Sequence, residues 1–200
     1  MLVTSEVCTG KTTALLDILS ESMHKTNSPI GVEIGVHRGN SSRLLLQSFQ
    51  NLTLIMVDPW KQSARQSDYY ASGDGCAKMT QPEHEIAYRE SVEITEEFSD
   101  RRIIVRTTST QAARVVSDDL TFVFVDGNHT YAAVKNDLLT WYPKILPGGV
   151  LCGHDMNHPR DRSGKWGVTK AVREISYITG IPYQEWPDSL WSMQIPPTQQ

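Results

Sequence analysis

The sequence has few cysteines, no long apolar run and no excess of positive charge, and each absence excludes a class of protein. Its three cysteines, Cys8, Cys76 and Cys152, are far apart, so they predict free thiols rather than a disulfide framework or a zinc site. No apolar run reaches the roughly 18 residues that a membrane-spanning helix needs. The N-terminus lacks the charged and apolar regions of a signal peptide, so we expect a cytoplasmic location.

The charge balance gives no electrostatic reason to expect a nucleic acid or a membrane as partner. Nineteen basic residues stand against 23 acidic ones, for a formal net charge of −4. A small-molecule partner is compatible with that balance, and the sequence leaves a homo-oligomer open. Hydrophobic residues make up 39% of the 200, which is enough for a single domain with a substantial core.

Short apolar segments alternate with helical stretches along most of the chain. The apolar segments are near-continuous, which is typical of strands buried on both faces of a parallel sheet. They span residues 30–34, 52–57, 102–105, 121–125 and 149–152. Helices are expected at residues 41–49, 83–98, 110–116, 131–145 and 168–178. This order predicts an α/β fold with a Rossmann-like, doubly wound and mostly parallel sheet.

Other segments lie outside this rhythm. Residues 1–28 are expected to form an N-terminal helical segment ahead of a single domain at residues 29–200. Residues 60–82 form a polar insertion that contains Gly73 and Gly75, and an insertion of this kind after a strand predicts a mobile lid. Residues 183–195 hold two apolar stretches that fit a closing antiparallel pair.

The first strand ends in a glycine-containing turn, EIGVHRG, at residues 33–39. In open α/β sheets, ligands bind beyond the carboxyl ends of the strands. Gly35 permits a sharp turn, and Gly39 lets a ligand or a helix approach the backbone. Val36 and Arg38 interrupt the GxGxxG pattern of a dinucleotide site, which disfavours an NAD-dependent oxidoreductase. Taken alone, the turn also fits an ordinary strand–helix connection.

Acidic residues at the first two strand ends suit an adenosine cofactor that lacks phosphate. Glu33 precedes the first glycine and suits an ammonium group, and His37 lies in the same turn. Asp58 ends the second strand, where a carboxylate accepts hydrogen bonds from ribose hydroxyls. Together these residues predict a site for S-adenosylmethionine.

The fourth and fifth strands end in a second group of polar residues. Asp126 and the pair His154–Asp155 follow strands that should be neighbours, so the three side chains could converge on one cation. Two carboxylates suit Mg²⁺, and a nitrogen ligand shifts the preference towards metals such as Mn²⁺. His129 lies three residues past Asp126 and titrates near neutral pH, so it could act as a general base. The alternatives are a packing role for His154 and a backbone-bonded His129.

Four stretches of the chain resemble class I S-adenosylmethionine-dependent methyltransferases. They read VEIGVHRGNSS, LIMVDPW, FVFVDGNHTYAAVKNDL and LPGGVLCGHDM, and they span roughly residues 30–175 in the family's order. The pattern is most similar to small O-methyltransferases that include relatives of macrocin O-methyltransferase. A weaker likeness connects the chain to catechol-type O-methyltransferases.

The resemblance implies roles for individual residues. Ser41 would hold the carboxylate of the cofactor, Asp58 its ribose and Ser109 its adenine edge, while Asp126 would serve cofactor, metal and catalysis. The chain departs from the catechol-type pattern in two places: Asp58 replaces a glutamate, and His154–Asp155 replaces an Asp–Asn pair.

The resemblance also implies an activity. We expect methyl transfer to the oxygen of a small hydroxylated acceptor, such as a sugar or a phenol, with Mg²⁺ or Mn²⁺ assisting. The alternatives are a metal-independent methyltransferase and a cofactor-binding domain that has lost catalysis.

Overall fold

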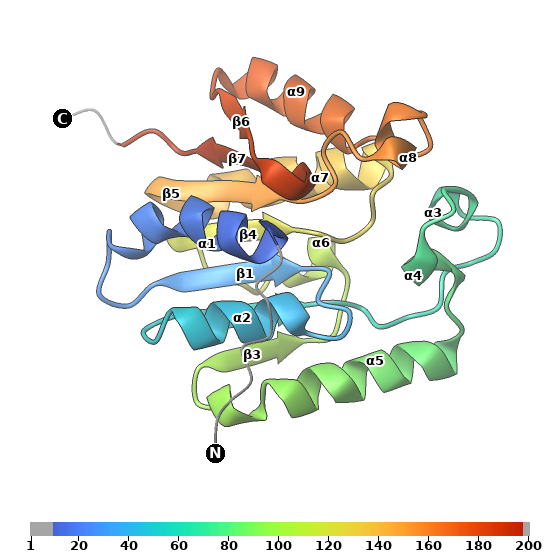
Figure 1. Ribbon diagram of the computed structural model, residues 1–200, viewed down its shortest axis with the longest axis horizontal. Coiled ribbons are helices and arrows are strands. Elements are labelled where there is room, and N and C mark those ends of the chain that lie inside the picture. Colours follow the sequence, from blue (N-terminus) through green and yellow to red (C-terminus); the bar gives the residue numbers. More distant parts are fainter. Residues whose placement is uncertain (1–9, 198–200) are drawn as a thin grey trace.

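The computed structural model describes residues 10–197, which fold around one seven-stranded sheet (Figure 1). In spatial order the strands are β3 (Arg102–Val105), β2 (Thr53–Val57), β1 (Ile30–Ile34), β4 (Leu120–Val125), β5 (Ile145–Gly153), β7 (Trp191–Gln194) and β6 (Tyr183–Glu185). Strands β3 to β5 run parallel, whereas β7 is antiparallel to both of its neighbours. The Rossmann-like, mostly parallel sheet is confirmed, and so is the antiparallel pair near the C-terminus.

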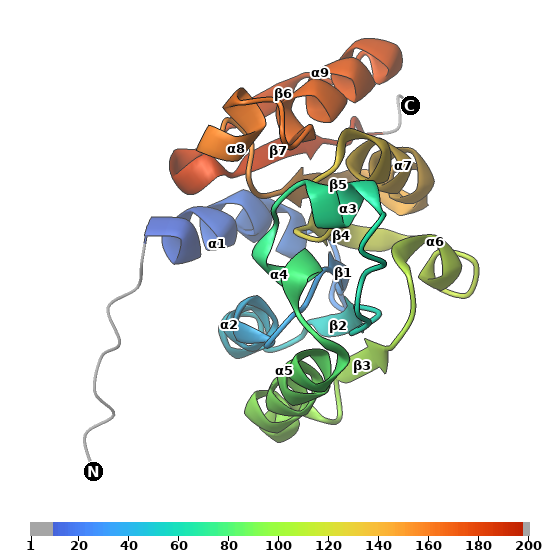
Figure 2. The same cartoon turned by 90° about the vertical axis from the view of Figure 1, so that its right-hand side faces the viewer.

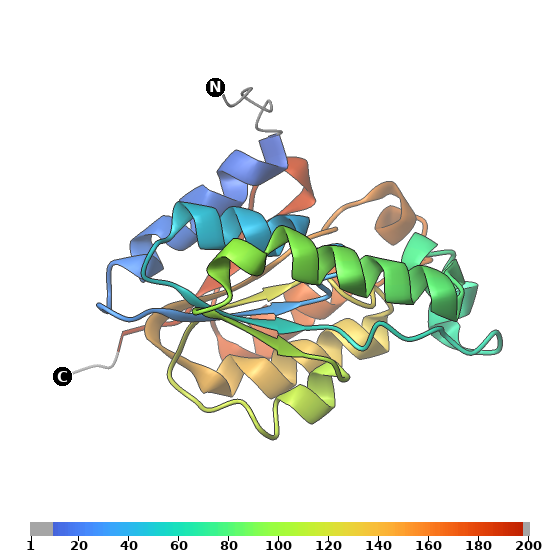
Figure 3. The same ribbon diagram turned by 90° about the horizontal axis from the view of Figure 1, so that it is seen from below.

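Helices cover both faces of the sheet (Figure 3). One face carries α1 (Gly10–Met23), α2 (Asn40–Ser48) and α5 (Gln81–Ile94), and the other carries α6 (Ser109–Ala112), α7 (Tyr131–Trp141) and α9 (Val168–Thr179). The remaining short elements are α3 (Asp68–Ala71), α4 (Gly75–Lys78), α8 (Pro159–Arg162) and the 3-10 turns η1 (Glu96–Phe98), η2 (Tyr142–Lys144) and η3 (Pro187–Ser189).

The central strand β4 shows why the apolar runs are continuous. All six of its residues are buried. Phe122 and Phe124 pack in the cluster formed with α1 and α2, while Val123 and Val125 pack in the cluster formed with α7 and α9. Each such side chain contributes about 1.5–3 kcal/mol when it is fully buried. A strand between two helical layers therefore has no polar face.

The helix ahead of β1 belongs to the same core as the sheet. Leu15 and Leu19 of α1 are at most 1% exposed and share a cluster with Phe122 of β4. The segment expected at residues 1–28 is thus helical over Gly10–Met23, and Cys8 lies outside the described residues. Cys76 and Cys152 are free thiols. Within residues 10–197, no helix is long and apolar enough to cross a membrane.

Some of the expected helix boundaries are wrong. The helix expected at residues 131–145 ends at Trp141, and β5 begins at Ile145 rather than at residue 149. Pro143 lies in the intervening turn η2 and cannot donate a backbone hydrogen bond, so the helix cannot continue through it. Likewise, α5 ends at Ile94 instead of residue 98, and α6 ends at Ala112 instead of residue 116.

The insertion at residues 60–82 lies over the carboxyl ends of the central strands (Figure 2). Although the insertion is mostly polar, it is partly packed into the core, since its first residue, Trp60, is 1% exposed. Its two short helices begin at side-chain caps: Ser67 accepts from Tyr70 N, and Asp74 accepts from Cys76 N. The insertion therefore has a defined structure beside the strand ends.

Candidate active site

The turn after β1 requires its first glycine. Gly35 has φ 91°, and a Cβ at this position would lie 2.3 Å from the backbone oxygen of Asp126. Gly39 has φ 81° and caps α2, and a Cβ there would lie 3.0 Å from Ser91 Cα of α5. Gly35 thus lets β1 and β4 end side by side, and Gly39 serves the approach of a helix, one of the two roles expected for it.

Asp58 connects the ends of the first two strands. Its Oδ2 accepts the N–H of His37 at 3.0 Å, and its Oδ1 accepts the N–H of Trp60 at 2.7 Å. The indole Nε1 of Trp60 donates in turn to the carbonyl oxygen of His37 at 2.7 Å. Burial raises the pKa of Asp58, and the two backbone hydrogen bonds oppose that shift. His37 and Asp58 are therefore fixed against each other.

A cleft of about 600 Å³ opens beside these strand ends. Its walls come from the ends of β1, β2 and β4, from the insertion, and from the starts of α6 and α7. Among the residues that line it are Gly35, His37, Asp58, Ser109, Gly127, Asn128 and Asp137. A cleft of this size, with the partly buried carboxylate of Asp58 at one strand end, suits an adenosine cofactor.

Ser109 lies in this cleft within a hydrogen-bonded chain. Its hydroxyl accepts from Trp141 Nε1 at 2.8 Å and also bonds the carboxylate of Asp137. Asp137 is 6% exposed, and burial raises its pKa to about 6, although Ser109 partly opposes the shift. Sequence reasoning missed Asp137, because an acid within an apolar helix gives no sign of which side it faces.

Glu33 and Ser41 lie elsewhere than the cleft wall. Glu33 is 1% exposed, and its carboxylate accepts a hydrogen bond from Ser42. Ser41 is half-buried in the first turn of α2 and, in the part of the chain that the structure describes, is absent from the residues that line the cleft. Ser42, which the sequence analysis did not single out, is thus the serine that contacts the predicted glutamate.

The ends of β4 and β5 bring three predicted residues together. Asp126, His154 and Asp155 each offer one ligand atom, and these atoms lie within 4.8 Å of one another. His154 Nδ1 is 3.1 Å from Asp155 Oδ2 and 3.6 Å from Asp126 Oδ1. Asp155 has a positive φ of 65°, a conformation that non-glycine residues adopt rarely and often at functional sites.

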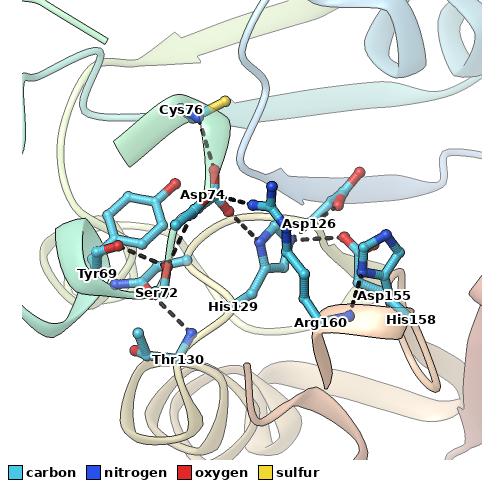
Figure 4. A network of polar contacts seen from close by, with 12 residues as sticks. Tyr69, Ser72, Asp74, Cys76, Asp126, His129, Thr130, Asp155, His158 and Arg160 are labelled. Atoms are coloured by element: carbon cyan, nitrogen blue, oxygen red, sulfur yellow. Dashed lines mark hydrogen bonds and ion pairs between the residues drawn. The ribbon is translucent and has the colours of Figure 1, made fainter. Parts of the chain in front are cut away.

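His129 lies against the same cluster (Figure 4). Its Nε2 is 2.9 Å from Asp155 Oδ2 and 3.6 Å from Asp126 Oδ1, yet this buried atom makes no well-aligned hydrogen bond. Its Nδ1 is 2.5 Å from Oδ2 of Asp74, which comes from the insertion. Sequence reasoning missed Asp74, since 55 residues separate it from His129.

Aromatic stacking fixes the plane of the His129 ring. Trp166 stacks on His129 with centroids 4.3 Å apart and on His158 with centroids 4.6 Å apart. The guanidinium of Arg160 lies over the same indole and donates to the carbonyl oxygen of Gly73. The loop after β5 and the insertion therefore meet around His129.

The carboxylates control the charge of the two histidines. Burial alone would lower the pKa of His129, but interactions with Asp126, Asp155 and Asp74 outweigh it and raise the pKa to about 11. Burial is likewise outweighed at His154, where Asp126 and Asp155 raise the pKa to about 9. Both rings are therefore in the charged imidazolium form for as long as no cation balances the charge of these carboxylates.

The donor set fits a divalent cation. Two carboxylates and one imidazole supply hard oxygen and borderline nitrogen ligands. The buried Nε2 of His129 faces the same carboxylates and lies 2.9 Å from Asp155 Oδ2. Asp126, His154 and Asp155 are thus the residues that would hold such an ion, as the sequence predicts.

Known proteins share this fold at low sequence identity. An O-methyltransferase family protein from Burkholderia thailandensis has a TM-score of 0.64 at 12% identity, over 92% of this chain and 56% of that one. The O-methyltransferase NovP has a TM-score of 0.62 at 18% identity, over 94% and 80%. The N-methyltransferase NodS from Bradyrhizobium japonicum has a TM-score of 0.58 at 14% identity, over 93% and 94%.

Comparison of the sequence with known proteins and families identifies the family of this chain. An uncharacterized protein of Sinorhizobium fredii, y4gI, is 27% identical over 158 residues, which are 76% of this chain and 16% of that protein. The chain thus spans a small part of the length of that curated relative. A family model described as a methyltransferase domain, Methyltransf_24, matches residues 32–156. That match runs from β1 to the loop after β5, which includes Asp58, Asp126, His154 and Asp155. The chain therefore belongs to this methyltransferase family, whose cofactor is S-adenosylmethionine.

Proposed function

We propose that this methyltransferase transfers a methyl group to the oxygen of a small hydroxylated acceptor, such as a sugar or a phenol, with a divalent cation assisting. The observation that carries the proposal is the group of Asp126, His154 and Asp155, whose ligand atoms lie within 4.8 Å of one another beside a histidine. A site that holds both a cation and a base suits the removal of a hydroxyl proton.

The cofactor is proposed to lie in the cleft. S-adenosylmethionine supplies the electrophilic methyl group when it is bound. Asp58 would accept hydrogen bonds from the ribose hydroxyls, since each of its oxygens, although bonded to one backbone N–H, has a further lone pair. Ser109 of α6 and Asp137 of α7 line the same cleft. His37 lines the cleft and is proposed to contact the amino-acid end of the cofactor. Glu33 and Ser41, which the sequence assigns to the ammonium and carboxylate groups of the cofactor, and Gly39 are proposed to act from beside the cleft wall.

The acceptor's proton is proposed to go to His129. Its Nε2 faces Asp126 and Asp155, so an acceptor hydroxyl beside those carboxylates would lie within reach of this nitrogen. A divalent cation held by the carboxylates would lower the pKa of that hydroxyl. The two carboxylates raise the pKa of His129 only while their charge is uncompensated, so balancing it favours the neutral imidazole that a base requires.

The test is methyl transfer from labelled S-adenosylmethionine to matched phenol, sugar and amine acceptors, with and without EDTA. We expect transfer to hydroxyl groups, loss of activity in EDTA, and recovery with Mg²⁺ or Mn²⁺. Full activity in EDTA would contradict the cation and favour a metal-independent methyltransferase. Transfer to amines alone would contradict O-methylation, and cofactor binding without any transfer would indicate a domain that has lost catalysis.

A further inference from the structure

The insertion contributes a carboxylate to the polar group around His129. Asp74 is 4% exposed, and its Oδ2 lies 2.5 Å from Nδ1 of His129, the nitrogen on the far side of the ring from Asp126 and Asp155. An ionised carboxylate accepts hydrogen bonds and cannot donate them. The proton of this bond therefore belongs to Nδ1, and Nε2 is the ring nitrogen directed at the two carboxylates at the strand ends.

Asp74 is itself held firmly. Its Oδ1 accepts the N–H of Cys76 at 2.8 Å as the cap of α4, and its own N–H donates to Ser72 Oγ at 3.3 Å. Tyr69 also hydrogen-bonds the carboxylate. Next to it, the carbonyl oxygen of Gly73 accepts from Arg160 of α8. Contacts within the insertion and from Arg160 of α8 therefore hold the Asp74 carboxylate in place beside His129 (Figure 4).

We infer that Asp74 is a positioning residue for the methyl-transfer reaction: it holds the Nδ1 proton of His129 and thereby directs Nε2 at the acceptor. This inference rests on the function proposed above. A hydrogen bond from the distal nitrogen to a carboxylate is a common way to fix the tautomer and orientation of an active histidine. It also gives the insertion a part in the chemistry, besides lining the cleft.

Asp74→Asn is the informative variant. Asparagine caps a helix about as well as aspartate, so α4 should be retained. However, an amide has one acceptor oxygen, whereas Asp74 uses one oxygen for Cys76 N–H and the other for His129. The variant therefore cannot satisfy both donors. Asp74→Glu keeps the charge, and Asp100→Asn is a matched control, because Asp100 is exposed in the turn before β3.

The first measurement needs neither cofactor nor acceptor. Nitrogen-15 NMR of the six histidines, assigned with His129→Gln, should show a protonated Nδ1 at His129 with a downfield proton. That signal should persist in Asp100→Asn and lose its downfield shift in Asp74→Asn. An Nδ1 proton without a downfield shift in the unsubstituted protein, or one whose shift is unchanged in Asp74→Asn, would overturn the inference even if methyl transfer to oxygen were established.

The second measurement is kinetic. Asp74→Asn should lower kcat by about 10–10²-fold, with the KM for S-adenosylmethionine unchanged, and Asp74→Glu should recover part of the loss. An unchanged kcat in Asp74→Asn would overturn the inference. So would a loss confined to thermal stability or to KM, because that result would reduce Asp74 to a cap of α4. If no acceptor is methylated, the proposed function fails, and the NMR result still decides the role of Asp74.

Discussion

The backbone N–H of His37 donates to Oδ2 of Asp58 over 3.0 Å, which ties the turn after the first strand to the end of the second. A side chain fixed in this way does not have to be ordered when a ligand binds. Preorganisation of this kind lowers the entropic cost of binding. The relationship places the carboxylate of Asp58 at the edge of the cleft before the cofactor arrives.

Asp58→Ala should weaken the binding of S-adenosylhomocysteine at least tenfold, which is about 1.4 kcal/mol. The substitution removes the proposed ribose contacts and also the acceptor for two backbone N–H groups. Calorimetry on folded protein measures the effect, with Asp118→Ala as a control at an exposed position. Unchanged affinity in Asp58→Ala would remove Asp58 from the cofactor site.

Gly35→Ala should lower the free energy of unfolding by at least about 2 kcal/mol. Its φ of 91° is unfavourable for alanine, and the added Cβ would meet the backbone of Asp126 at 2.3 Å. Gly75→Ala is the matched control, because no atom lies within 4 Å of a Cβ there. Denaturant unfolding compares the two variants, and equal stability would show that the turn can rearrange at little cost.

Asp137 should contribute to stability in a way that falls as the pH rises towards neutrality. Burial raises its pKa from 3.8 to about 6, so between these values the folded state binds a proton that the unfolded state has released. The contribution is present below about pH 4, is lost as the pH passes about 6, and amounts to about 3 kcal/mol in total.

Asp137→Asn removes this titration and should flatten the dependence between these pH values. Unfolding of both proteins by denaturant, without cofactor, isolates the contribution of Asp137 from those of other titrating groups. Parallel curves for the two proteins would contradict the prediction.

Residues 60–82 should exchange their amide hydrogens more slowly once S-adenosylhomocysteine is bound. The insertion contributes Trp60, Ser67 and Tyr69 to the wall of the cleft, so a ligand there adds contacts that oppose local opening. Hydrogen exchange followed by mass spectrometry gives the comparison, and α1, on one face of the sheet, serves as the reference segment. Equal protection with and without ligand would show that the insertion is no lid.

The sequence by itself determined the sheet and the edge of the sheet at which several acidic residues lie. Apolar runs such as residues 121–125 have no polar face, and only a strand covered on both sides allows that. Because parallel strands end at one edge of a sheet, Asp58, Asp126 and Asp155 could be assigned to that edge from their positions after the runs. The ends of helices were predicted less well: the sequence analysis extended α7 through Pro143, although proline has no backbone N–H to continue the helix.

Only the tertiary structure decided which side chains touch across long separations. The pairing of Asp74 with His129 depends on how the insertion folds back over the strand ends, and a polar stretch carries no periodic signal for that. Ser42 rather than Ser41 contacts Glu33, because one residue along a helix turns the side chain by about 100°. The local sequence pattern thus determines at which edge of the sheet the polar residues lie, whereas tertiary packing determines which side chains they contact.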